Sequence, residues 1–294
     1  MKIIDAHHHF WDPTINNHPW LRELPMIPFR YGDYSSIKSP YLPSHYAEET
    51  KDWDVIANIT MEGEWTPDDP TGEAIWMQKL ANQTGRPAAH VAQAWLDQPD
   101  LEYVLQVYSD LPIVRSVRHK PRANSEPGGP AGGMTEHAFR SGFSKLNDFN
   151  LMFDLQTPWW HLKEAIDMAR LAPQVPIILN HAGLPSDRSE RGLQDWRTAL
   201  AAFAALPQTY VKISGLGLPD TPWLLENNAV IIQTCIDLFG PERAMFASNF
   251  PVDRLCGSFS NIYNGFDLAS RHLSVLEREA LFFKTAASVY NVEI

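Results

Sequence analysis

Short apolar, β-branched segments alternate with longer segments of helical periodicity along this chain. The strand-like segments lie at residues 2–6, 55–61, 88–95, 113–118, 151–155, 175–180, 210–213 and 244–247. The helical segments lie at 71–84, 99–109, 136–148, 162–171, 193–205, 222–239, 259–272 and 275–286. Strict alternation of strand and helix is typical of parallel βαβ units, and eight such units close into a barrel. We therefore predict an α/β fold, a (β/α)8 TIM barrel, as one domain over residues 1–294.

The first strand-like segment is followed by a long irregular stretch, residues 11–52, rich in proline, aromatic and polar residues. A loop of this length inside a compact domain is usually functional. We expect an excursion that covers the mouth of the barrel.

Composition excludes several classes of protein. The formal net charge is -11, whereas nucleic-acid binders need basic surfaces. No apolar run approaches the ~18 residues of a membrane span. The two cysteines, Cys235 and Cys256, form no CxxC motif or disulfide framework. We expect a cytoplasmic protein with a small-molecule partner and no nucleic-acid or membrane partner; a homodimer is compatible with the sequence but is not indicated by it.

Polar side chains gather where the predicted strands end, which is where α/β barrels carry their active sites. They are His7 and His9 after the first strand, Glu62 and Glu64 after the second, Arg118, His119 and Lys120 after the fourth, Asp154 and Gln156 after the fifth, His181 after the sixth, Lys212 and Ser214 after the seventh, and Asn249 and Asp253 after the eighth. Buried polar groups are costly unless they are paired. Their concentration at one end of the barrel therefore predicts a functional site.

The pair His7 and His9 is the most specific part of this pattern. Residues i and i+2 of a strand point to the same side, so both imidazoles can converge on a metal ion or a substrate. His8 points the other way, and we expect it to have a packing or hydrogen-bonding role. His181, after the sixth strand, adds a third imidazole.

Four motifs resemble the amidohydrolase superfamily: IDAHHHFWD, VRSVRHKP, IILNHAGLP and MFASNFPVD. The resemblance covers nearly the whole chain and is closest to the lactonase-type branch, which includes 2-pyrone-4,6-dicarboxylate lactonase and sugar-acid lactonases. It implies a barrel enzyme that hydrolyses a cyclic ester, with the family's histidines at His7, His9 and His181.

One position departs from the family pattern. An aspartate is usual after the eighth strand, but Asn249 stands there, and an amide cannot act as a base at neutral pH. Asp253 can supply the missing carboxylate, or it can be a loop residue in a salt bridge. Asp5 is expected to orient a histidine, as carboxylates behind a site often do. The candidate catalytic residues are thus His7, His9, His181, Asn249 and Asp253.

Two mechanisms remain open. With a metal, His7, His9 and His181 would bind it, and the ion would activate water. Without one, the same histidines would polarise the carbonyl while a carboxylate activates water. No lysine on the fourth or fifth strand presents itself as the bridging carboxylated ligand of a binuclear site, and the eighth-strand carboxylate is missing. We therefore favour an enzyme that requires no cofactor, with one divalent ion, Zn2+, as the alternative.

The substrate is expected to be anionic or polyhydroxylated. The candidate binding residues are Arg118, His119, Lys120, Gln156 and Lys212. A guanidinium grips a carboxylate with paired hydrogen bonds, and a lysine offers a point charge. The alternative for each cation is a salt bridge inside the barrel, for instance with Asp154 or Glu62. Other functions also remain open: a metal-dependent decarboxylase or amide hydrolase of the same superfamily, or a non-catalytic barrel that binds a small molecule, which Asn249 would explain.

Overall fold

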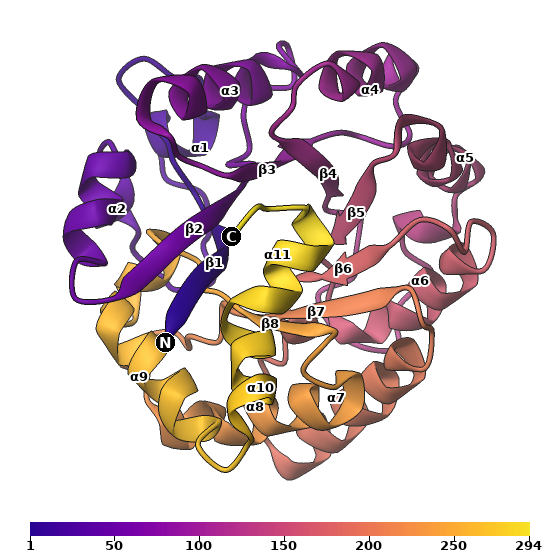
Figure 1. Ribbon diagram of the computed structural model, residues 1–294. Coiled ribbons are helices and arrows are strands. Elements are labelled where there is room, and N and C mark those ends of the chain that lie inside the picture. Colours follow the sequence, from indigo (N-terminus) through magenta and orange to yellow (C-terminus); the bar gives the residue numbers. More distant parts are fainter.

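The computed structural model describes all 294 residues and contains one sheet of eight parallel strands in the order β1 to β8. Figure 1 shows the strands at the centre of the molecule with the helices around them, as the alternating sequence pattern predicts. The strands are β1 Lys2–His8, β2 Asp54–Met61, β3 Ala89–Gln93, β4 Val114–His119, β5 Met152–Leu155, β6 Ile177–Leu179, β7 Thr209–Ile213 and β8 Ala244–Phe246. The (β/α)8 barrel is confirmed.

The helices that follow the strands form the outer ring. They are α3 Gly72–Thr84, α4 Leu101–Ser109, α5 His137–Lys145, α6 Leu162–Ala169, α7 Glu190–Ala204, α8 Leu225–Phe239 and α9 Phe259–Ala269. Their inward faces and the strands form one apolar core. Each predicted helical segment is present, with ends that differ by a few residues.

The barrel closes between β1 and the segment after β8. The Asn249 amide N–H donates to the His7 carbonyl, and the His9 amide N–H donates to the Phe250 carbonyl, both at 2.7 Å. These bonds place the catalytic candidates of the first and eighth strands side by side at the carboxyl end of the barrel.

Asp5 stabilises this contact between β1 and the segment after β8. Its buried carboxylate accepts hydrogen bonds from the Ser248 amide N–H at 2.8 Å, the Ser248 hydroxyl at 2.5 Å and the Tyr46 hydroxyl at 3.0 Å. The expectation that Asp5 orients a histidine was wrong, because its oxygens are used to anchor the end of β8.

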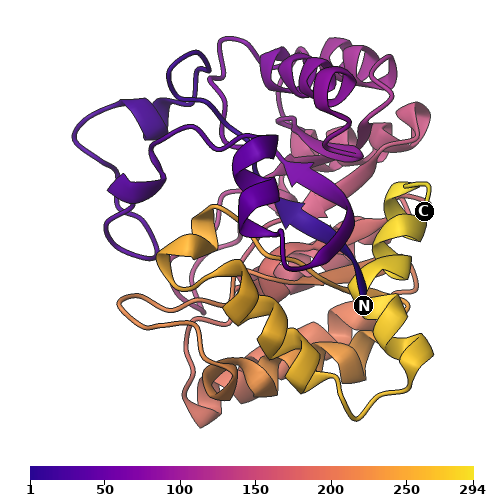
Figure 2. The same ribbon diagram turned by 60° about the vertical axis from the view of Figure 1, so that its left-hand side comes forward.

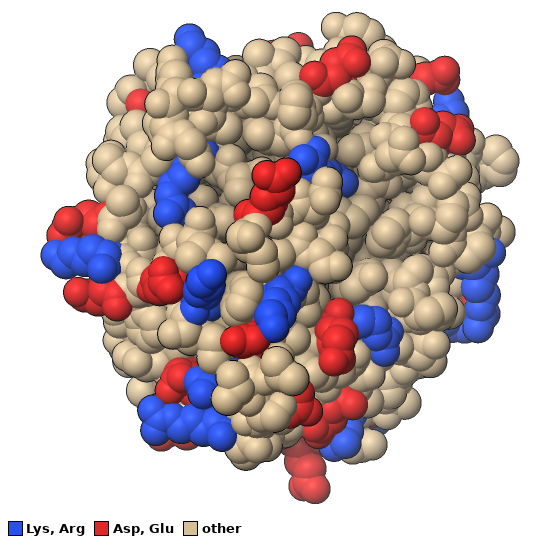
Figure 3. Space-filling view, viewed as in Figure 1, with Lys and Arg blue, Asp and Glu red and all other residues tan.

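The opposite end of the barrel is covered by the C-terminal helices. α10 Val275–Glu279 begins with the predicted capping box of Ser274 and Glu277 and continues through a π-helical turn into α11 Thr285–Tyr290. Figure 1 shows this helical segment lying across the strands near the N-terminus. Figure 3 shows the same face in space-filling form, with acidic and basic side chains interspersed rather than gathered by sign.

The excursion lies over the carboxyl end of the barrel, where its residues Trp11, Trp20 and Phe29 line the same cavity as His9. It contains two short helices, α1 Pro19–Arg22 and α2 Pro43–Glu49, and a β-bridge between Trp11 and Tyr41. Figure 2 shows it projecting on the side away from both termini. Aromatic packing gives it a fixed shape: the Trp20 and Phe29 rings stack with centroids 5.7 Å apart. No helix is long and apolar enough to cross a membrane.

Candidate active site

Three histidine rings meet at the carboxyl end of the barrel. The centroid of the His7 ring lies 5.4 Å from that of His9 and 4.5 Å from that of His181. His7 and His9 alternate with His8, whose ring faces outward, stacks on Tyr46 and lies 2.6 Å from the Asn58 amide nitrogen. The strand's period of two therefore separates two site histidines from one structural histidine.

A backbone contact determines which nitrogen of the His9 ring carries the proton. His9 Nδ1 lies 3.1 Å from the Met61 carbonyl oxygen, which can only accept a hydrogen bond. In the neutral ring the proton is therefore on Nδ1, and Nε2 carries a free lone pair. His181 Nδ1 lies 2.9 Å from the Ser214 hydroxyl. Both ring nitrogens of His7 are buried without a hydrogen-bond partner.

The three imidazoles are neutral at pH 7. Burial is the main cause that lowers the pKa of His7, His9 and His181 well below the usual value. Nearby cations add to it: Arg118 acts on His9, and Arg30 acts on His181. Glu62 acts on His9 in the opposite direction and stabilises its protonated form.

His9 and His181 open into a cavity of about 310 Å3, the inner compartment. Other polar groups on its wall are Arg30, Glu62, Glu64, Arg118, Lys120, Gln156 and Asn249. Trp11, Trp20 and Phe29 of the excursion form an aromatic side. Imidazole, amide and guanidinium groups therefore face one cavity that can receive a small polar molecule.

A buried ion pair forms part of the wall. Arg118 Nε donates to Glu62 Oε1 at 2.5 Å, Nη2 donates to the Glu62 carbonyl at 2.7 Å, and Nη1 donates to Gln156 Oε1 at 3.1 Å. Burial opposes the ionisation of Glu62, but the charges of Arg118 and Lys120 and the hydrogen bond from Arg118 together outweigh it, so the pKa of Glu62 is lowered. Arg118 and Gln156 are thus held side by side on the cavity wall.

Asn249 and Asp253 form a second buried pair. The Asn249 side-chain amide donates to Asp253 Oδ1 at 2.6 Å, and the Tyr31 hydroxyl donates to the same oxygen at 3.0 Å. Arg30 lies 3.7 Å from this oxygen. Burial is the main cause that raises the pKa of Asp253 to about 6. Asn249 lines the inner compartment, whereas Asp253 lies behind it.

The other predicted binding residues are His119, Lys120 and Lys212, of which only Lys120 lines the inner compartment. Lys120 pairs with Glu64 at the edge of the cavity. His119 lies outside the inner compartment, accepts a hydrogen bond from the Leu96 amide at 3.1 Å and stacks on Phe139. Lys212 is fully buried inside the barrel, 2.8 Å from Asp154, which also accepts from the Tyr290 hydroxyl. The ion pair that the sequence left open as an alternative for Lys212 is present.

Sequence reasoning missed Arg30 and Tyr31. Both come from the excursion, where no periodicity marks individual side chains, so no local pattern pointed to them. Arg30 nevertheless lies on the cavity wall and next to Asp253.

The backbone is strained at the same place. Glu64, His181 and Asn249 all have left-handed conformations, with φ values of 61°, 53° and 57°. Such conformations are costly outside glycine and cluster at functional sites. At His181 and Asn249, the strained turn directly after the strand directs the side chain into the barrel mouth.

The fit to a metal ion is incomplete. His9 offers an unprotonated Nε2, and His7 has two unpartnered nitrogens, so the donor chemistry suits a divalent ion. However, no group of three or more His, Cys, Asp or Glu side chains is arranged to hold one. The residues present therefore do not complete a metal site.

Comparison with known proteins agrees with this architecture. A family model described as Amidohydrolase matches residues 4–292. The chain is 35% identical to protein y4mH of Sinorhizobium fredii over 99% of both chains. It is 26% identical to an L-fucono-1,5-lactonase of Burkholderia multivorans over 98% of this chain and 95% of the relative. It also matches the crystal structure of an amidohydrolase from Burkholderia multivorans with bound zinc, at 25% identity and a TM-score of 0.81 over the full length of both chains. The motifs, the barrel and these matches together show that the chain belongs to the amidohydrolase family.

Proposed function

We propose that this enzyme opens the lactone ring of a sugar acid by hydrolysis and releases the open-chain hydroxy acid. The observation that carries the proposal is the single cavity in which neutral His9 and His181 face Arg118, Gln156 and Asn249. The similarity to an L-fucono-1,5-lactonase over nearly the whole chain supports the same substrate class.

In the proposed mechanism, His9 Nε2 accepts a proton from the attacking water. The water oxygen bonds to the lactone carbonyl carbon, and the carbonyl becomes an oxyanion. Glu62 stabilises the imidazolium that forms on His9 and so offsets part of the cost that burial and Arg118 impose on its protonation. When the ring C–O bond breaks, the same proton passes from His9 to the departing ring oxygen.

The oxyanion requires donors or positive charge at the carbonyl oxygen. We propose that the Ser214 hydroxyl donates to His181 Nδ1, so that His181 Nε2–H donates to the carbonyl oxygen. Burial keeps the His181 ring neutral, with charge repulsion from Arg30 as the second cause, and the Arg30 guanidinium adds positive charge near the oxyanion.

Asn249 and Asp253 have separate roles in this proposal. Asp253 accepts from the Asn249 amide nitrogen and thereby orients the Asn249 carbonyl oxygen as an acceptor for water or a substrate hydroxyl. Asp253 is a positioning residue, because the Asn249 side chain lies between it and the cavity. Arg118, Lys120 and Gln156 bind the hydroxyl groups of the substrate and the carboxylate of the product.

The test follows acid release from a panel of sugar-acid and dicarboxylate lactones with metal-analysed protein, before and after chelation. Turnover of a sugar-acid lactone that survives chelation supports the proposal. Turnover lost on chelation and restored by zinc would favour the alternative, one divalent ion held by His7, His9 and His181. Tight binding of the lactones without turnover would instead favour a non-catalytic binding barrel.

A further inference from the structure

A second cavity of about 390 Å3, the outer compartment, lies next to the inner one. The two share Trp20, Ile27, Glu62, Glu64, Arg118 and Lys120 as lining residues. The histidines of the reacting centre, His9 and His181, line only the inner compartment. A single lactone ring held at the histidines therefore leaves the outer compartment empty.

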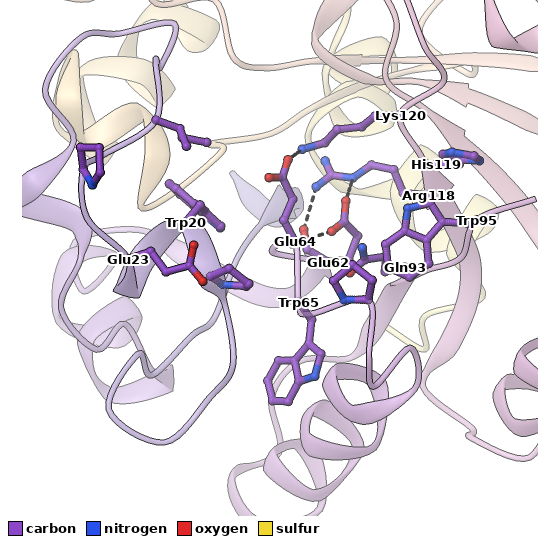
Figure 4. Close-up of a pocket in the computed structure, with 14 residues that line it drawn as sticks. Trp20, Glu23, Glu62, Glu64, Trp65, Gln93, Trp95, Arg118, His119 and Lys120 are labelled. Carbon is purple, nitrogen blue, oxygen red and sulfur yellow. Dashed lines mark hydrogen bonds and ion pairs between the residues drawn. The ribbon is translucent and has the colours of Figure 1, made fainter. Parts of the chain in front are cut away.

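The ion pair between Lys120 and Glu64 lines both compartments. Figure 4 shows Lys120 reaching Glu64 across the pocket, beside the pair of Arg118 and Glu62. The Lys120 and Glu64 side chains are 35% and 45% exposed, unlike the buried pair of Arg118 and Glu62. Partly exposed ion pairs contribute little to stability, so a ligand that spans both compartments can displace this one.

The lining of the outer compartment suits a sugar ring. Trp20, Trp65 and Trp95 line it, and each is only half-buried. Indole rings offer flat apolar faces against which the C–H face of a sugar packs, and polar groups between them bind hydroxyls. Glu23 and Gln93 supply such groups from opposite sides of the pocket (Figure 4).

The two compartments differ in the balance of charged side chains that line them. In the inner one, the cations Arg30, Arg118 and Lys120 face two carboxylates, Glu62 and Glu64. The outer compartment lacks Arg30 and gains the carboxylate of Glu23, so acidic groups exceed basic ones there. An oxyanion and a product carboxylate are therefore favoured inside, whereas a second anionic group is disfavoured outside.

We propose that the natural substrate is a sugar-acid lactone that carries a neutral sugar ring as a substituent. The lactone occupies the inner compartment, and the neutral sugar occupies the outer one, against Trp65. This inference rests on the proposed lactone hydrolysis and specifies its substrate class.

The experiment compares matched pairs of substrates by their kcat/KM values. Each pair consists of an aldonolactone and the same lactone bearing a galactosyl or glucosyl group, such as glucono- and lactobionolactone; a lactone bearing an aryl group of similar size is a third arm. We expect at least one glycosylated lactone to be hydrolysed about tenfold more efficiently than its unsubstituted partner, the difference that one good stacking contact can supply.

Variants locate the contact. Trp65→Ala should lower kcat/KM for the glycosylated lactone about tenfold more than for the unsubstituted one, and Trp65→Phe should restore most of that difference because it keeps an aromatic face. Trp160→Ala is the matched control, since Trp160 is also half-buried but lines a separate pocket. Melting temperatures of all variants show whether a loss reflects unfolding.

Each outcome decides a different proposal. The outer sugar site is overturned if every glycosylated lactone has a lower kcat/KM than its unsubstituted partner. It is also overturned if Trp65→Ala lowers kcat/KM equally for both members of a pair. Either result leaves the proposed lactone hydrolysis intact. Preference for the aryl arm overturns the neutral sugar as its occupant. Failure to hydrolyse any lactone overturns the proposed function and this inference with it.

Discussion

Asn249 donates its side-chain amide to the buried carboxylate of Asp253 at 2.6 Å, in the place where the superfamily usually has an aspartate. The carboxylate is thus four residues further along the chain and one side chain further from the cavity. This relationship separates the two functions that one aspartate would combine: Asn249 faces the substrate space, and Asp253 supplies the negative charge behind it.

The Asp253 carboxyl predicts an unusual pH dependence of stability. Its folded-state pKa is raised from 3.8 to about 6, so the folded protein holds this proton more tightly than the unfolded chain does. The contribution is fully present below pH ~4 and is lost as pH rises through about 6, with a size of about 3 kcal/mol. Urea unfolding between pH 4 and 7.5 should show this slope in the wild type and a reduced slope in Asp253→Asn. Equal slopes would mean that Asp253 titrates normally.

Placing an aspartate at position 249 tests the same pair. Asn249→Asp replaces a donor with a second carboxyl group within hydrogen-bond distance of Asp253, and two buried carboxylates this close cannot both ionise. We expect the variant to lose stability above pH ~6 and to recover part of it at lower pH, where the pair shares a proton. Melting temperatures against pH measure the effect. A variant more stable than the wild type at pH 8 would contradict the buried pair.

His9 as the proton acceptor predicts a loss in kcat. Its replacement in His9→Ala should lower kcat by about 10²- to 10⁴-fold, the usual contribution of a general base, with a smaller change in KM. Because the pKa of His9 is well below the usual value, the acid limb of kcat/KM should lie below pH 6.5. His137→Ala is the control, since that histidine is exposed on α5. A wild-type rate that declines below pH 7.5 would argue against a neutral His9.

Arg118 and Lys120 should differ in their effect on stability. Arg118→Ala leaves the buried Glu62 carboxylate unpaired, which typically costs about 3–5 kcal/mol. Lys120→Ala breaks a partly exposed pair and should cost less than about 1 kcal/mol. Both should raise KM if they bind substrate. Denaturant unfolding of the two variants makes the comparison, and equal costs would show that the Glu62 pair is not specially buried.

Lys212 is expected to act on stability through Asp154. Lys212→Met leaves that fully buried carboxylate without its cation, and we expect the free energy of unfolding to fall by about 3–5 kcal/mol. Tyr290→Phe removes one hydroxyl donor to the same carboxylate and should lower it by about 1–3 kcal/mol. Unfolding free energies measure both. An unchanged stability together with a tenfold higher KM in Lys212→Met would restore Lys212 as a substrate-binding residue.

The sequence alone determined the barrel and the position of its histidines. Strand and helix periodicities are local properties, so eight alternating units could be read from the order of residues. The period of two within β1 separated His7 and His9 from His8, and the rule that barrel sites lie at the carboxyl ends of strands brought in His181, Arg118 and Asn249.

Which polar groups pair and which remain available depends on contacts between strands that are far apart in the sequence. Asp5 anchors the end of β8, and Lys212 is neutralised by Asp154, because contacts across the barrel determine these partners and no local pattern encodes them. Arg30 reaches the site from an excursion without periodicity, and its position depends on how aromatic side chains pack across that segment. Pairing and burial are properties of the assembled barrel, and they convert a set of polar strand ends into a cavity with defined protonation states.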